Sequence, residues 1–194
     1  MSLQGQRTTT SAIDWDDFRS LIGKLERDGE YKFCVLIATG VFTGLRISDL
    51  LNLRFNQFNG EVLEVNERKT GKHRRIKINH DLKSVIMRLK EKMKVKEDSL
   101  MFLNRYSTKP IDQSYVNVKL KEIFKKYNIK VEGNCSSHLF RKTLGNRVMK
   151  MNNGKNEALY LLMDMFSHSN PSTTKRYLGI REKELFSVYD SLNL

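Results

Sequence analysis

Cysteine and proline are scarce in this chain, and the scarcity of each excludes certain structural features. The two cysteines among 194 residues, Cys34 and Cys135, stand alone, without the paired spacing of a zinc site. No disulfide framework can be built from them, so we expect an intracellular, reduced protein. With two prolines, no internal repeat and no low-complexity segment, the sequence shows no interior linker.

Long apolar runs and clustered metal ligands are also missing. No segment is apolar over the length needed to cross a bilayer, and no signal peptide is visible, so we expect no membrane association. The four histidines lack the close pairing of zinc ligands. We therefore predict no metal and no cofactor, and any catalysis has to proceed without one.

Acidic residues are outnumbered by basic ones, 22 to 35, which gives a net charge of +13. The basic residues gather in three segments, RKTGKHRR, KEKMKVK and FKKYNIK. A charge this large favours a polyanionic partner, with nucleic acid ahead of a membrane surface. The alternative is a solvated basic face without a specific ligand.

The hydrophobic pattern predicts one mainly helical domain with a small antiparallel β-hairpin, an α+β arrangement. Residues 1–10 are polar and aperiodic and are expected to be a disordered tail or an expression scar, with the domain over residues 11–194. Helices are expected from Ser11 or Asp14 to about Leu25, over Phe33–Val41, after Gly44 through Leu53, over Leu82–Leu89, Val116–Tyr127, His138–Met149 and Glu157–Met165, from Pro171 to about Tyr177, and over 181–192. Strands are expected at Glu61–Val65 and Arg75–Asn79.

The segment MFSHSNPSTTKRYLGI combines a helix start with side chains that can do chemistry. Asn170 can cap the free backbone amides, and Pro171 suits the first helical position because it lacks only an unused N–H. His168 then precedes the helix, and Tyr177 lies about two turns into it. On this segment alone, an ordinary core tyrosine is the alternative interpretation.

Two other segments carry arginines suited to phosphate. Arg46, in TGLRISDLLNL, lies at a helix start, and its forked guanidinium matches a phosphate; a local pair with Asp49 is the alternative. In HLFRK, His138 and Arg141 are three residues apart and lie on one side of a helix. Lys69 falls in the exposed turn of the hairpin. Each signal alone is weak.

Together these signals resemble one family. Arg46, Lys69, His138, Arg141, His168 and Tyr177 occur in the order and contexts of the tyrosine recombinases, the phage integrase family, which the chain resembles from about Ser11 to Tyr189. TGLRISDLL resembles the first arginine box of that family, ERKTG its hairpin lysine, HLFRKT its HxxR box, and FSHSNPSTTKRYL its histidine and tyrosine box. The chain departs from the family where Phe166 and Ser167 replace the usual Leu-Gly, and where Lys142 replaces a common histidine.

The resemblance implies a recombinase or integrase catalytic domain that cleaves and rejoins DNA strands through a 3′-phosphotyrosine, without metal or ATP. In such a domain the two arginines neutralise the phosphate, the two histidines add hydrogen bonds to its oxygens, and His138 also helps to take the proton of the nucleophile Tyr177. Lys69 protonates the departing 5′ oxygen. Basic residues near these groups are candidate contacts to the DNA backbone: Lys72, Arg74, Arg75, Lys175 and Arg176.

The resemblance also implies partners and a location. We expect double-stranded DNA as substrate, a homotetramer on DNA, a monomer off DNA, and a bacterial cytoplasmic protein at the nucleoid. We expect this sequence to lack the N-terminal core-binding domain that members of the family usually carry. The apolar stripe of the last helix is a candidate for docking on a neighbouring subunit: Leu185, Val188, Tyr189 and Leu192.

Two other functions remain open at this point. A type IB topoisomerase shares the fold and the phosphotyrosine step, but that group usually has lysine where this chain has His138. A DNA-binding module derived from an integrase is the non-enzymatic alternative, although such a module has no need of Tyr177.

Overall fold

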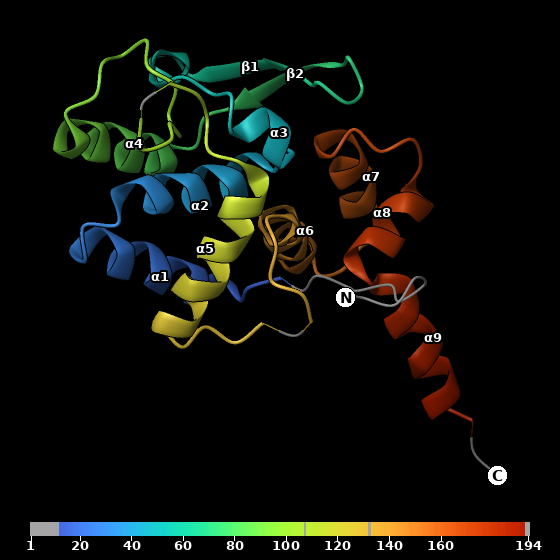
Figure 1. Ribbon diagram of the computed structural model, residues 1–194. Coiled ribbons are helices and arrows are strands. Elements are labelled where there is room, and N and C mark those ends of the chain that lie inside the picture. The colour runs from blue at the N-terminus through green and yellow to red at the C-terminus, as the bar shows by residue number, and fades with distance from the viewer. Residues whose placement is uncertain (1–11, 107, 132, 193–194) are drawn as a thin grey trace. The chain divides into compact units, whose positions relative to one another are not determined.

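The computed structural model describes residues 12–106, 108–131 and 133–192, although not the side chains of residues 181–185. In this part of the chain the protein is mostly helical, with one two-stranded antiparallel sheet (Figure 1). The segment 1–10, expected to be a disordered tail, lies outside the described residues.

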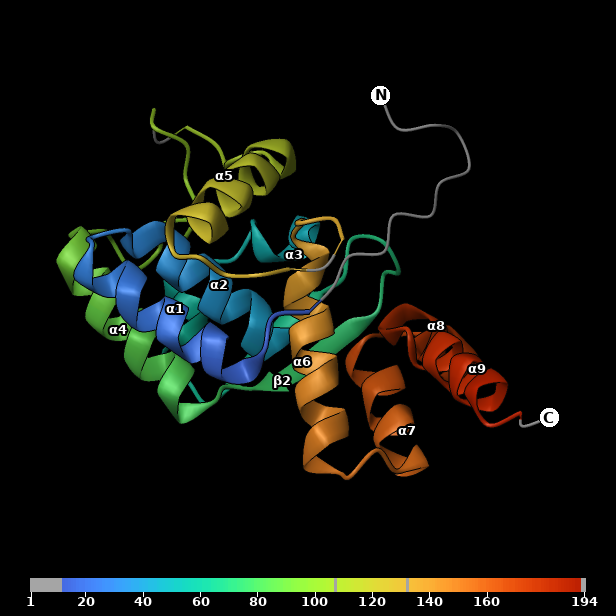
Figure 2. The same ribbon diagram turned by 90° about the horizontal axis from the view of Figure 1, so that it is seen from below.

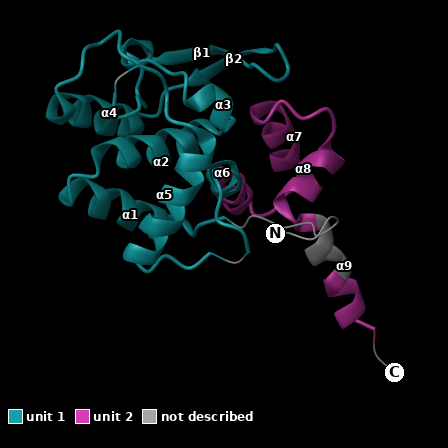
Figure 3. Cartoon of the chain, viewed as in Figure 1, with its two compact units in different colours: residues 1–143 teal, residues 144–194 magenta. Residues whose placement is uncertain are grey.

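The chain divides into two compact units: unit 1, residues 1–143, and unit 2, residues 144–194 (Figure 3). The boundary falls within helix α6 (His138–Met151), so the first residues of α6 belong to unit 1 and the rest to unit 2. Each unit has its own cluster of buried hydrophobic side chains.

Unit 1 is built around helix α2 (Tyr31–Thr43), which is apolar on all sides. Helices α1 (Trp15–Arg27) and α4 (His80–Met93) pack on α2 from two sides, and α5 (Gln113–Lys126) covers another side (Figures 1 and 2). A helix that is hydrophobic all round has to be covered in this way.

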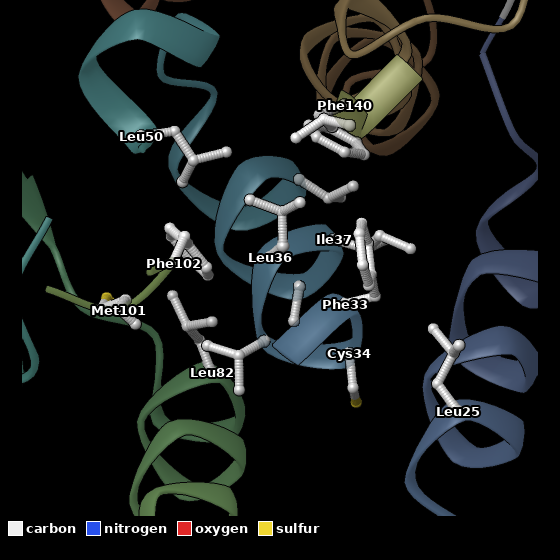
Figure 4. Close-up of a cluster of buried hydrophobic side chains, with 14 of the residues drawn as sticks. Leu25, Phe33, Cys34, Leu36, Ile37, Leu50, Leu82, Met101, Phe102 and Phe140 are labelled. Carbon is white, nitrogen blue, oxygen red and sulfur yellow. The ribbon is translucent and has the colours of Figure 1, made fainter. Parts of the chain in front are cut away.

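The core of unit 1 draws side chains from distant parts of the sequence onto α2. Leu25, Leu50, Leu82 and Phe102 surround its residues, and all of them are almost fully buried (Figure 4). Helix α6 makes its approach at Gly40, where an added Cβ would lie 2.5 Å from Cδ2 of the Phe140 ring. Only glycine permits this crossing of α2 and α6.

Gly44 ends α2 in the left-handed conformation, with φ of 59°, as the sequence predicts from the break at this point. Helix α3 that follows has a single turn, Ile47–Leu50. The prediction of helical spacing through Leu53 is wrong beyond Leu50, because the chain turns and the carbonyl of Leu53 accepts a hydrogen bond from the amide of Met101 at 2.9 Å. A 3₁₀ helix, η1 (Phe55–Phe58), comes next and was not predicted.

The hairpin consists of β1 (Val62–Asn66) and β2 (His73–Lys77), paired in antiparallel register with Leu63 opposite Ile76. The sequence predicts both strands but places β1 one residue and β2 two residues away from the observed starts. Local alternation identifies a strand well, whereas its ends depend on the pairing partner. The connecting turn contains Lys69 and Gly71, the latter at φ of 66°.

Unit 2 contains the rest of α6 and three further helices, α7 (Asn156–Met165), α8 (Pro171–Leu178) and α9 (Ile180–Asp190). Its cluster of buried side chains is small: Leu144, Leu162, Phe166 and Leu178. Gly145 lets α8 approach α6 closely, because a Cβ there would lie 2.5 Å from Cδ2 of Leu178.

Helix α9 exposes much of its apolar surface. Phe186, Val188, Tyr189 and Leu192 are each more than half exposed. Of the predicted stripe, Val188 and Tyr189 lie on α9, Leu192 lies two residues beyond its end at Asp190, and the side chain of Leu185 lies outside the described residues. The helix predicted over 181–192 is therefore two residues too long at its C-terminal end.

Candidate active site

Arg141 is buried in unit 1, with only 4% of its surface exposed. It lies one turn into α6, and its Nη1 donates to the carbonyl oxygen of Gly44 at 2.7 Å. A buried guanidinium needs such acceptors to offset its lost hydration. The bond ties the start of α6 to the turn between α2 and α3, two residues before Arg46.

Arg46 occupies the N-cap position of α3, where the extended backbone directs it out of the helix. Its Nη1 donates to Oε2 of Glu67 at 2.6 Å, and 20% of the Arg46 side chain is exposed. This pair differs from the alternative considered from the sequence, a bond to Asp49. Asp49 is buried, and its Oδ1 accepts the backbone amide of Arg68 at 3.0 Å.

Glu67 is the acidic centre of this region, and its side chain is fully buried. Besides Arg46, it accepts hydrogen bonds from Arg74 at 3.2 Å and from the Thr70 hydroxyl at 2.7 Å. Burial alone raises the pKa of a carboxylic acid, but here the bonds from Thr70, Arg46 and Arg74 outweigh burial and hold the pKa of Glu67 below its usual value. Glu67 is therefore a carboxylate at neutral pH.

Lys69 lies in the turn between the strands and is exposed, as the sequence predicts. The turn is closed by two backbone bonds, from the amide of Glu67 to the carbonyl of Lys72 at 2.9 Å and from Gly71 to Glu67 at 2.8 Å. Lys69 thus projects its ammonium group from a turn whose backbone is anchored on both sides.

His138 is the first residue of α6, and its surroundings favour the neutral imidazole. Partial burial lowers the pKa of His138, and the positive charges of Arg141, Lys142 and Lys69 lower it further. Arg141 bonds to Gly44, two residues before Arg46, and Arg46 bonds to Glu67, two residues before Lys69. Unit 1 therefore brings Arg46, Lys69, His138 and Arg141 into one basic region.

Unit 2 positions His168 at the end of α7. Ser167 is left-handed, with φ of 52°, and the amides of Ser167 and His168 bond back to the carbonyls of Asp164 at 3.1 Å and Met163 at 2.9 Å. This is a Schellman motif, in which the left-handed position favours glycine. The family departure at Ser167 thus has a physical meaning, because serine adopts the conformation at a cost in energy.

Helix α8 begins as the sequence predicts. The Asn170 side chain caps the helix by accepting the amide of Thr173 at 2.9 Å, and Pro171 occupies the first turn. One turn further on, the hydroxyl of Thr174 lies 3.0 Å from Nδ1 of His168. This contact fixes the orientation of the imidazole ring and leaves Nε2 as the nitrogen directed away from Thr174.

The rings of Phe166, His168 and Tyr177 form one cluster. Tyr177 contacts His168 at 5.5 Å between ring centroids and Phe166 at 5.8 Å, both edge to face. The structure therefore brings together the two candidates of this unit, His168 and Tyr177. By contrast, two other tyrosines of this unit, Tyr160 and Tyr189, are 58% and 69% exposed.

The predicted DNA contacts differ in their exposure. On the hairpin, Lys72 is exposed and Arg75 is exposed beside Glu64 at 3.2 Å. Arg176 on α8 is exposed, and Lys175 is half-buried. Arg74 does not share this exposure, because 10% of its side chain is accessible and it bonds Glu67 and the carbonyl of Thr43. The geometry of Arg74 fits a positioning role better than the expected phosphate contact.

Three residues that contact the candidate residues within their own units were not identified from the sequence: Glu67 in unit 1, and Thr174 and Phe166 in unit 2. Glu67 had one usable signal, since it is an acidic residue next to a strongly basic turn. Thr174 lies one turn before Tyr177 on the same side of α8. Phe166 had only the signal that it replaces the usual leucine of the family's histidine box.

Two further properties concern metals and membranes. Across residues 12–192, excluding the positions left undescribed, no three histidine, cysteine or acidic side chains group as metal ligands. Within the same described part of the chain, no helix has both the length and the apolar character to cross a membrane.

The chemistry available to each unit follows from these contacts. Unit 1 offers fixed cations, which suit the stabilisation of an anion. Unit 2 offers a phenol beside an imidazole, which suits nucleophilic attack. Neither set of groups requires a metal ion for these roles.

Comparison with known proteins identifies one family over most of the chain. The model of the phage integrase family matches residues 12–184. A probable integrase/recombinase, YoeC of Bacillus subtilis, is 31% identical over 170 residues, which cover 87% of this chain and 86% of YoeC. The tyrosine recombinase XerH of Campylobacter jejuni is 25% identical over 150 residues, 74% of this chain but 40% of XerH.

A solved structure shares the fold. The XerH site-specific recombinase, bound to a palindromic difH substrate in a post-cleavage complex, aligns with a TM-score of 0.67 and 17% identity. The alignment covers 93% of this chain and 54% of that chain, so the present chain spans about half the length of the XerH protein. Likeness to recombinase structures confirms the fold class predicted from the sequence.

Proposed function

Because the chain belongs to the phage integrase family, we propose that it cleaves and rejoins double-stranded DNA as the catalytic domain of a site-specific tyrosine recombinase. The expected family and enzyme class are confirmed by this membership and by relatives named tyrosine recombinases. The observation that carries the proposed chemistry is the contact of Tyr177 with His168 on unit 2.

Arg46 and Arg141 bind the scissile phosphate. A phosphodiester carries a negative charge that repels nucleophiles, and two fixed guanidinium groups offset that charge and its increase in the transition state. Support comes from the anchoring of both side chains, Arg141 to Gly44 and Arg46 to Glu67. His168 adds a hydrogen bond through its nitrogen that faces away from Thr174.

Tyr177 is the nucleophile. Its Oη forms a bond to phosphorus, the bond from phosphorus to the 5′ oxygen breaks, and a 3′-phosphotyrosine and a 5′ hydroxyl result. His138 accepts the phenolic proton, which fits an imidazole whose lowered pKa keeps it neutral. Lys69 gives a proton to the departing oxygen. Rejoining reverses these steps and requires no ATP, since the energy of the broken bond is kept.

The relatives and the net charge support the proposed substrate. The XerH structure was solved with its DNA substrate after cleavage, which supports DNA as the substrate of this chain. The net charge of +13 supports the same partner. We propose a homotetramer on DNA and a monomer off DNA, with the exposed apolar face of α9 docking on a neighbouring subunit. The location proposed is the bacterial cytoplasm, at the nucleoid.

Surface contacts to the DNA backbone are proposed for Lys72, Arg75, Lys175 and Arg176. These residues set affinity and its salt dependence rather than sequence choice. Arg74 is kept apart from this set because it is tied to Glu67.

A trapping experiment tests the function. The protein is incubated with a pool of nicked duplexes of random sequence, in which a cleaved strand diffuses away and the covalent adduct accumulates. We expect an adduct that survives denaturation with the wild type, Tyr160→Phe and Tyr189→Phe, and no adduct with Tyr177→Phe. An adduct formed by Tyr177→Phe contradicts the assignment of the nucleophile. DNA binding without any adduct contradicts the enzyme and leaves a DNA-binding module.

A further inference from the structure

Glu67 stands out as a buried acid in the most basic part of the chain. Its carboxylate is inaccessible to solvent and accepts three side-chain bonds, from Arg46, Arg74 and Thr70. The two oxygens are divided between these donors: Oε2 takes Arg46 and Thr70, and Oε1 takes Arg74. One carboxylate thus joins the first phosphate-binding arginine to the hairpin.

The same residue closes the turn that carries Lys69. The backbone amide of Glu67 bonds Lys72, and the carbonyl of Glu67 accepts the amide of Gly71. The Thr70 hydroxyl, which donates to Glu67, also accepts the amide of Lys72 at 3.3 Å. Lys69 therefore lies between two residues, Glu67 and Thr70, that bond to each other.

A second anchor holds the turn to α3. The amide of Arg68 donates to Asp49 at 3.0 Å, three residues after Arg46 in the chain. Arg74 extends the connection to the end of α2 through the carbonyl of Thr43. The turn is thus fixed at Glu67, Arg68 and Thr70, on both sides of Lys69.

Resting on the proposed function, we propose that Glu67 is a positioning residue that holds the Lys69 turn against Arg46. Lys69, the proton donor to the leaving oxygen, and Arg46, which binds the phosphate, are then held in position together. Glu67 does not touch the substrate in this proposal, and its effect on the reaction passes through Lys69 and Arg46. A misplacement of about 1 Å of a catalytic group can slow a reaction about 100-fold.

The competing interpretation is a structural counter-ion. In that case Glu67 only balances the buried charges of Arg46 and Arg74, and its loss lowers the fraction of folded protein without changing the chemistry of the folded molecules. The two interpretations differ in how the rate of cleavage depends on the leaving group. Only a displaced Lys69 makes protonation of the leaving oxygen the slow step.

The test compares Glu67→Gln with Glu64→Gln. Both changes remove one negative charge from the hairpin region, but Glu64 is 56% exposed and pairs with Arg75 at the surface. Thr70→Val is a milder variant that removes the hydroxyl and leaves every charge in place, and the exposure of Thr70 favours normal folding. Tyr177→Phe reports the background without the nucleophile.

Single-turnover cleavage is measured with an ordinary duplex and with one whose 5′ bridging oxygen is replaced by sulfur. A thiolate leaves without protonation because a thiol has a pKa of about 8.5, far below that of an alcohol. We expect Glu67→Gln to slow cleavage of the oxygen substrate about 10- to 100-fold relative to Glu64→Gln. The sulfur substrate should recover most of that loss. Thr70→Val should lose less with the oxygen substrate and should also recover most of its loss with the sulfur substrate.

Equal losses with both substrates, or rates of Glu67→Gln within about twofold of Glu64→Gln, would overturn the proposal. A wild-type protein that forms no adduct overturns the proposed function, and this inference with it, which separates that failure from a failure of Glu67 alone. Trypsin gives a readout that needs no activity, because it cuts after Arg68 and Lys69. Faster cutting there in Glu67→Gln than in Glu64→Gln supports the anchored turn, and equal cutting overturns it.

Discussion

The two units hold their candidate residues in different ways. Unit 1 fixes charged groups against a large core, so that Arg141 and Glu67 are almost completely buried and each is bonded to a distant part of the chain. Unit 2 holds Tyr177 on the short helix α8 and His168 in the turn between α7 and α8, beside a cluster of four buried side chains. Groups that stabilise charge must be held rigidly to be effective. A nucleophile needs only a defined helix and an oriented neighbour.

The largest effect is expected from Arg141→Lys in unit 1. Lysine keeps the charge but loses the forked geometry and the bond to Gly44. We expect the rate of adduct formation to fall about 10²- to 10³-fold, with little change in the helices of unit 2. Single-turnover cleavage measures the rate, and Arg75→Lys, on the exposed side of the hairpin, is the control. A loss of less than about tenfold would show that charge alone suffices.

The pH dependence of cleavage tests the neutral state of His138. Its pKa is lowered in the folded protein by partial burial and by neighbouring cations, so it stays a base below its usual pKa of about 6.5. The second-order rate constant, which reports the free enzyme, should therefore fall with an acid limb below that value. His138→Gln should remove the limb, whereas His73→Gln should not. An acid limb above pH about 6.5 would contradict the assignment.

The same shift affects stability. The unfolded chain binds a proton at His138 at a higher pH than the folded chain does, so the free energy of unfolding decreases as the pH falls through about 6.5 and stops decreasing below the folded pKa. Chemical denaturation of the wild type and His138→Gln at several pH values measures this contribution. If the wild type instead gained free energy of unfolding relative to His138→Gln as the pH falls, the shift in the pKa of His138 would have the opposite sign.

Two glycines compare the packing of the units directly. In Gly40→Ala the new Cβ meets the fully buried Phe140 ring, and in Gly145→Ala it meets a methyl group of Leu178. A ring in a dense core cannot move aside, whereas a leucine in a small cluster can rotate. We expect losses of about 2–3 kcal/mol in the free energy of unfolding for Gly40→Ala and about 1 kcal/mol for Gly145→Ala.

Hydrogen exchange locates these losses. Gly40→Ala should accelerate exchange in α2 and the start of α6, and Gly145→Ala should accelerate it in α8 alone. Equal losses, or the reverse order, would contradict the difference in packing between the units.

The smallest expected effect is a gain. Ser167 is left-handed at φ of 52°, where glycine has no steric penalty. Ser167→Gly should therefore raise the free energy of unfolding by about 1 kcal/mol without changing the rate of cleavage. Asn153, at φ of 51°, offers the matched change Asn153→Gly. A destabilised Ser167→Gly would mean that the serine hydroxyl has a role that its backbone does not explain.

Much of the fold could be predicted because the spacing and cap residues that indicate a helix lie within its own segment of the sequence. The spacing of Leu82, Ile86 and Leu89 gave α4, and the cap residues Asn170 and Pro171 gave the start of α8. The short α3 and the 3₁₀ helix η1 could not be predicted, because they depend on bonds to residues far along the chain, such as that between Leu53 and Met101.

The candidate site shows the same division. Motifs drew attention to Arg46 and to Tyr177, and the structure places Tyr177 against His168. The bond from Arg46 to Glu67 was not predictable, since Glu67 is 21 residues away, whereas the helical spacing indicated the nearby Asp49 as a partner. Local sequence thus shows which residues carry chemistry, whereas tertiary structure decides what holds them.

In the proposed reaction Tyr177 becomes covalently bound to DNA. The most direct test is to digest the trapped adduct with trypsin and nuclease and to identify the modified peptide by mass spectrometry. Cleavage after Arg176 and Arg181 releases the peptide YLGIR, which contains no other tyrosine. We expect a nucleotide attached to this peptide. A nucleotide found instead on a peptide containing Tyr160 or Tyr189 would show that Tyr177 is not the nucleophile.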